Sequence, residues 1–76
     1  MAMHYARLKN SPRQQVMLSI LSDGQEHSTA EIQDTSKDCY ETRVCAVNSV
    51  ASELRMNGIH VRCRQVGRVF YYRLGK

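Results

Sequence analysis

Residues 58–74 read GIHVRCRQVGRVFYYRL, with apolar and polar side chains in alternation on both sides of a connection at residues 65–68. Alternation with a period of two predicts two β-strands, and the short connection predicts that they pair as a hairpin. We expect one face of this hairpin to be apolar and to close the core: Ile59, Val61, Cys63, Phe70, Tyr72 and Leu74. We expect the other face and the turn to be basic and polar: Arg62, Arg64, Gln65, Arg68 and Arg73.

The segment before the hairpin predicts a helix from about Glu41 to Met56. Its apolar residues are spaced three or four apart, as on one face of a helix: Val44, Val47, Ala51 and Leu54. The opposite face carries small or polar residues: Thr42, Cys45, Ala46, Ser49, Ser52 and Glu53. The larger Arg43 and Asn48 lie at the flanks of this face. Such a face suits a helix that lies deep in a groove, but a helix whose outer face only meets water has the same pattern.

Another helix is predicted nearer the N-terminus. Ser11 before Pro12 is typical of an N-cap followed by proline at the first helical position, and Gly24 supplies a left-handed stop. The apolar residues between them recur on one helical face: Val16, Met17, Ile20 and Leu21. We expect this helix to hold the core.

A further helix is predicted to begin at the capping box Ser28-Thr29-Ala30-Glu31, in which the cap and the third residue satisfy each other's backbone amides. It follows a short extended stretch at residues 25–27 and is expected to end at about Thr35, before a polar turn at residues 36–40. Ser28 also lies near His27 and Glu31, as in a hydrolytic set. The cap explains these residues without catalysis, and no G-x-S-x-G turn accompanies them.

Charge is distributed unevenly along the chain. Residues 1–39 hold four Lys and Arg against five Asp and Glu, whereas residues 40–76 hold seven against two, a net charge of +5. Six of those seven cations are Arg, whose planar fork binds phosphates and guanine edges through paired hydrogen bonds. This asymmetry indicates a polyanionic partner, although a solvated basic surface is the alternative.

Length and residue types limit the function classes. Seventy-six residues allow one domain, which we place at residues 11–76 after a flexible arm at residues 1–10, and they leave little room for a substrate cleft. We therefore expect no enzyme, no cofactor and no small-molecule substrate. Cys39, Cys45 and Cys63 form no C-x-x-C pair and lack zinc-ligand spacing with the histidines, so we expect no metal. The odd cysteine count and the lack of an apolar signal segment predict a cytoplasmic, reduced chain, and the absence of a long apolar run predicts no membrane span.

The order helix, short strand, helix, helix, strand, strand resembles the winged helix-turn-helix family over residues 11–74. These segments carry the resemblance: Ser28-Thr29-Ala30-Glu31-Ile32; Val47, Ala51 and Leu54; Gly58-Ile59; Gly67-Arg68; and Tyr71-Tyr72-Arg73-Leu74. Within that family the chain is similar to small helix-turn-helix proteins of bacteriophages and prophages. The resemblance implies a regulator or accessory factor that binds double-stranded DNA, alone or as a homodimer.

A helix fits the major groove, where side chains read base edges while phosphate contacts fix the register. The residues that we expect to read DNA from the third helix are Thr42, Arg43, Asn48, Ser49 and Ser52. The residues that we expect to contact DNA from the wing are Arg62, Arg64, Gln65 and Arg68. Two alternatives stay open: a docking or dimerisation module, and an accessory factor of an excision or replication complex. Steep salt dependence distinguishes DNA binding from apolar docking.

Overall fold

A computed structural model describes residues 7–38 and 42–75 of the chain. Within these ranges the helices are η1 (Leu8–Asn10, a 3-10 helix), α1 (Pro12–Leu21), α2 (Thr29–Thr35) and α3 (Val47–Met56). The strands are β1 (His27–Ser28), β2 (Val61–Val66) and β3 (Val69–Leu74), which form one antiparallel sheet. The prediction of an α+β fold with three α-helices and a C-terminal hairpin is confirmed for the described residues.

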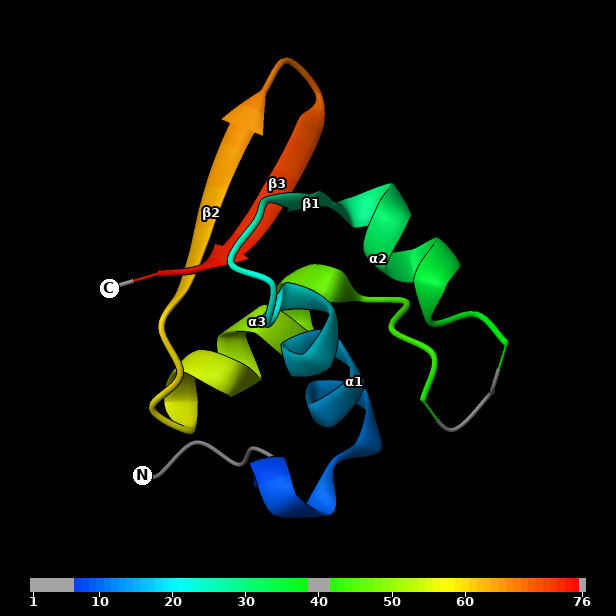
Figure 1. The fold of residues 1–76 in the computed structure, drawn as a ribbon, viewed down its shortest axis with the longest axis vertical. Helices are drawn as coiled ribbons and strands as arrows, with labels where there is room; N and C mark the ends of the chain where they lie inside the picture. Colours follow the sequence, from blue (N-terminus) through cyan, green and yellow to red (C-terminus); the bar gives the residue numbers. More distant parts are fainter. Residues whose placement is uncertain (1–6, 39–41, 76) are drawn as a thin grey trace.

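The sheet has the order β1-β3-β2, so β3 is the central strand and β2 lies at an edge. β2 and β3 pair from Val61 opposite Leu74 to Val66 opposite Val69. Gly67 begins the turn between them with φ +61°, a value that a residue with a Cβ rarely adopts. The hairpin extends away from the helices, which gather around its base (Figure 1).

The core lies between the helices and the base of one sheet face. Its buried apolar residues are Met17, Leu21, Ile32, Val44, Val47, Val50, Ala51, Leu54, Val61 and Tyr72. Cys63 and Phe70 lie on the same sheet face, Phe70 nearer the turn and Cys63 on the edge strand opposite the buried Tyr72, and both are exposed, Phe70 by 41%. The expectation that these two residues close the core is wrong, because the helices cover only the base of the hairpin (Figure 1).

The predicted helix starts are confirmed at α1 and α2. Ser11 caps α1 by accepting from the Gln14 backbone amide, and Ser28 caps α2 by accepting from Glu31. The capping box of α2 is only half formed, since the Glu31 carboxylate contacts the His27 ring instead.

α3 begins at Val47 and not near Glu41, which lies outside the described residues. Side chains of α1, α2 and the residue after α2 bind the backbone of the loop before α3: Arg13 Nε donates to Arg43 O at 3.0 Å, Gln33 Nε2 donates to Cys45 O at 2.7 Å, and Ser36 Oγ accepts from Val44 N at 2.9 Å. These hydrogen bonds hold the backbone of residues 43–45 in a non-helical conformation. The Val44 side chain of this loop is buried in the core.

A polar cluster joins the N-terminal end of α1 to the C-terminal end of α3. The buried Gln14 side chain donates to Glu53 Oε2 at 3.2 Å and accepts from Asn57 Nδ2 at 2.8 Å. Asn57 Oδ1 in turn accepts from the backbone amide of Leu8 at 3.1 Å, which ties η1 to the fold. Of the residues 1–10 that the sequence assigned to an arm, Leu8–Asn10 thus pack on the domain, and residues 1–6 lie outside the described part.

Candidate nucleic-acid interface

The outward face of α3 is exposed and polar. The helical period buries Val47, Val50, Ala51 and Leu54 and turns the intervening positions to solvent. Asn48, Ser49, Ser52 and Arg55 are the exposed ones, and we call them the α3 face. Three of the five residues expected to read DNA therefore share one helical surface.

No acidic side chain belongs to the α3 face. The only acid of α3, Glu53, is half-buried on the flank next to α1, where it accepts the hydrogen bond from Gln14 Nε2. A carboxylate is thus kept off the face that would meet a phosphate backbone. Arg55 supplies a cation, and its Nε donates to the Val61 carbonyl at 2.9 Å, which holds the side chain beside the start of β2.

Sequence reasoning missed Arg55, although a signal was present. It follows Asn48 by seven residues and Ser52 by three, which places all three on one side of a helix. Thr42 and Arg43 were expected on this surface but lie in the loop before α3. The guanidinium of Arg43 donates to the Lys37 carbonyl at 3.1 Å, so that side chain packs on the loop after α2. The assignment of both residues to the helix is corrected accordingly.

The register of the hairpin divides the predicted wing residues between two sheet faces. Gln65 shares a face with Cys63 and Phe70, the face whose base packs on the helices. Arg62 and Arg64 point to the opposite face, and Arg68 lies in the turn. The four residues expected to contact DNA together are therefore not one cluster.

Arg64 is engaged within the protein. Its Nε and a terminal nitrogen donate to the two Glu26 carboxylate oxygens at 2.9 and 2.7 Å, and its guanidinium lies 5.6 Å from the centre of the Tyr71 ring. These hydrogen bonds to the Glu26 carboxylate raise the pKa of Arg64. This side chain crosses β3 and joins β2 to the segment before β1, so its structural role competes with the predicted phosphate contact.

A hollow of about 310 Å³ separates the start of α3 from the hairpin. Its lining brings together residues of α2, α3, β2 and β3: Thr29, Ala46, Val47, Asn48, Cys63, Phe70 and Tyr72. Asn48 of the α3 face and the exposed Phe70 ring thus border one concave surface. The hairpin end also exposes Val66 by 50% and Val69 by 42%, which sequence reasoning did not single out because both lie beside the predicted turn.

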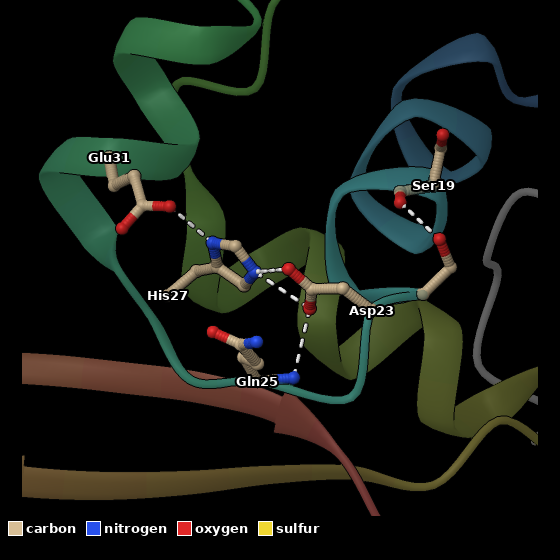
Figure 2. Close-up of polar contacts among 6 residues, drawn as sticks. Ser19, Asp23, Gln25, His27 and Glu31 are labelled. Carbon is tan, nitrogen blue, oxygen red and sulfur yellow. Dashed lines mark hydrogen bonds and ion pairs between the residues drawn. The ribbon is translucent and has the colours of Figure 1, made fainter.

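A charged cluster around His27 joins the turn after α1 to β1 and α2 (Figure 2). His27 Nε2 lies 2.9 and 3.0 Å from the two Asp23 carboxylate oxygens, and Nδ1 contacts Glu31. The hydrogen bond to Asp23, more than that to Glu31, raises the pKa of His27. The pKa of Asp23 is lowered first by the Gln25 backbone amide and then by His27. Ser28 Oγ accepts from the Glu31 backbone amide as the α2 cap, and His27 makes its two polar contacts with carboxylates.

Comparisons with protein-family models, curated proteins and solved structures find no match to this chain. In residues 7–38 and 42–75, none of the helices has the length and apolar character needed to cross a membrane.

Proposed function

We propose that the chain is a winged helix-turn-helix domain that binds double-stranded DNA through the α3 face. In this proposal α3 enters the major groove, and the hairpin lies beside it as the wing. The order of the elements and the hairpin that follows α3 directly support the fold assignment. At ten residues, α3 is about 15 Å long, a length that suits a groove about 12 Å wide.

The single observation that carries the proposal is the exposed, acid-free α3 face. An Asn side chain pairs with adenine through two hydrogen bonds, which is the role we assign to Asn48. Ser49 and Ser52 offer short hydroxyl donors to phosphate, sugar or bases, and their size allows close approach of the helix. Arg55 supplies a phosphate or guanine contact at the end of the same face.

The hairpin adds affinity from the side of the hollow. Gln65 and Phe70 face the hollow side of the sheet, and Arg68 in the turn makes no hydrogen bond or ion pair with the described residues. An unpaired arginine in an exposed turn suits a phosphate or a narrow minor groove. The biological role that follows is occupation of a duplex site, which alters transcription, replication or recombination nearby.

A fluorescence-anisotropy titration at two or more salt concentrations tests the proposal, with random duplexes and with fragments flanking the gene. We expect affinity to fall steeply as salt rises, because each phosphate contact releases counterions. Arg68→Ser should reduce the slope of log affinity against log salt by about one. Lys9→Ser removes the same charge from η1, at the other end of the molecule, and should leave the slope unchanged. Binding that is absent, or insensitive to salt, would refute the proposal.

A docking module for another protein is the second candidate, and the exposed Val66, Val69 and Phe70 at the hairpin end favour it. Apolar side chains gathered at an exposed end are typical of an interaction surface. Binding through them would depend little on salt and would be lost in Phe70→Ser. The same titrations therefore separate the two functions.

A further inference from the structure

Arginines gather on the sheet face turned away from the helices. Arg62 of β2 lies directly opposite Arg73 of β3, and Arg64 follows on the same face. These three arginines and Glu26 line a hollow of about 330 Å³, together with Cys63. We call Arg62 and Arg73, with the neighbouring Arg64, the arginine face.

The side chains of Arg62 and Arg73 make no hydrogen bond or ion pair with any described residue, which sets them apart from Arg64 and its partner Glu26. Like charges directly opposite each other in an antiparallel pair are unfavourable, so this arrangement does not stabilise the sheet. The two guanidinium groups therefore have no counter-charge within the described fold, and an external anion would relieve their repulsion.

Arg62 is also held in place by its surroundings. A Cβ built on Gly75 would lie only 2.3 Å from Arg62 Cδ and 2.8 Å from its Cγ. The aliphatic stem of Arg62 thus lies directly over the Gly75 backbone, a position that only glycine permits. This contact limits the directions in which the guanidinium can point.

Acidic groups on a second copy of the chain are poor partners for the arginine face, because the described acids other than Asp38 already have partners. The pairs are Asp23 and Glu31 with His27, Glu26 with Arg64, Asp34 with Lys37, and Glu53 with Gln14. Asp38 makes no such pair but lies within the electrostatic attraction of Lys37. A paired acidic side chain of a second copy could bind the arginine face only after breaking its own contact. The phosphates of a nucleic-acid backbone have no such contact to break.

We propose that the arginine face binds the phosphate backbone of a second DNA duplex, so that one molecule bridges two duplex segments. This inference rests on the proposed function, in which the first duplex lies against the α3 face and the hollow side of the hairpin. The thickness of the sheet separates that duplex from Arg62 and Arg73. Arginine guanidinium groups form paired hydrogen bonds to phosphate oxygens. Two such groups on directly opposite positions of β2 and β3 suit adjacent phosphates.

A bridging assay tests the inference directly. One duplex is fixed to beads, protein is added, and retention of a second, fluorescent duplex is measured, alongside anisotropy with the fluorescent duplex alone. We expect the wild-type protein to retain the second duplex. Arg62→Ser/Arg73→Ser should lose this retention while binding to a single duplex falls only slightly. Arg7→Ser/Lys9→Ser, which removes two charges from the η1 end, is the matched control and should behave as wild type.

Gly75→Ala provides a second variant that keeps every charge. The added methyl group displaces the Arg62 stem, so retention of the second duplex should fall while single-duplex affinity is unchanged. Circular dichroism verifies that each variant is folded.

Each outcome is decisive. Single-duplex binding without retention by the wild type overturns the bridging inference and leaves the proposed function intact. Retention that survives Arg62→Ser/Arg73→Ser also overturns it, since bridging would then arise elsewhere. A wild-type dimer in sedimentation that this double variant makes monomeric would assign the arginine face to self-association and overturn it. Absence of any duplex binding refutes the proposed function and the inference together.

Discussion

The helical body and the hairpin use their polar side chains in opposite ways. In the body, Gln14, Ser36 and Asn57 are bonded within the protein, and every buried side-chain polar atom of the described residues has a partner. On the hairpin, Arg62, Arg68 and Arg73 have none among the described residues, and apolar side chains are exposed at its end. The comparison teaches that polar groups of the body are used within the protein, whereas the hairpin leaves charged and apolar side chains exposed.

The largest expected effect on the free energy of unfolding comes from truncating a buried side chain of α3. Leu54 is fully buried, and Leu54→Ala should lower the free energy of unfolding by about 2–5 kcal/mol through lost burial and a residual cavity. Phe70→Ala, at the exposed hairpin end, should change it by less than about 1 kcal/mol. Urea unfolding followed by far-UV circular dichroism measures both. Equal losses would contradict the division between body and hairpin.

A buried hydroxyl provides the next test. Ser36 Oγ accepts from Val44 N and donates to Ile32 O, both at 2.9 Å, so it fixes the loop that precedes α3. Ser36→Ala leaves these two backbone groups without that partner and should cost about 1–3 kcal/mol of unfolding free energy. Ser49→Ala, on the exposed α3 face, is the matched control and should be neutral within about 0.5 kcal/mol. A neutral Ser36→Ala would show that the loop does not depend on this contact.

For binding, Asn48→Ala should weaken the interaction with a preferred duplex by about 1–3 kcal/mol and relax the choice of base at one position. Its stability should match that of the wild type, because the side chain is exposed. Selection from a random duplex pool, followed by anisotropy on the enriched site, measures both effects. Ser19→Ala, exposed on α1, is the control. Unchanged affinity and unchanged enrichment would remove α3 from the interface.

The smallest expected effect is the pH dependence of the His27 cluster. Because the pKa of His27 is raised in the fold, its contribution is present below its ordinary pKa of about 6.5 and is lost as pH rises through the folded value. Asp23 acts in the opposite sense: its lowered pKa makes its contribution present above about 3.8 and lost as pH falls through the folded value. Stability from this pair should therefore be greatest in mildly acidic solution.

Urea midpoints from pH 4 to pH 9 follow this dependence, and His27→Gln should flatten it on the alkaline side. Ionic strength is held constant, because both carboxylates of the cluster are partly exposed. A wild-type midpoint that rises steadily from pH 6 to pH 8 would contradict the assignment.

Local signals predicted much of the fold, and contacts between distant residues account for most of what they missed. Ser11-Pro12, the Ser28 cap and the alternation on both sides of Gly67 each depend on neighbours within a few positions. The start of α3 depends instead on Arg13 and Ser36, whose bonds to the loop backbone span 30 and eight positions. The spacing of apolar residues along the sequence does not reveal contacts between such distant positions.

The site was predicted in part for the same reason. Asn48, Ser49 and Ser52 share a face because a helix has a fixed period. Arg64 was predicted to contact DNA, because the sequence pattern does not reveal its partner Glu26, which lies 38 positions away along the chain. Alternation placed Phe70 on the apolar face correctly, but the length of hairpin that the helices leave uncovered emerges only in three dimensions.

The edge position of β2 has a consequence for handling the protein. Among the described residues β2 has a neighbouring strand on one side only, so its outer margin can template the addition of a foreign strand. The unpaired charge of Arg62 opposes the approach of an identical margin, and this repulsion is screened within about 3 Å at 1 M salt. Concentrated salt thus weakens the repulsion that opposes growth of intermolecular sheets.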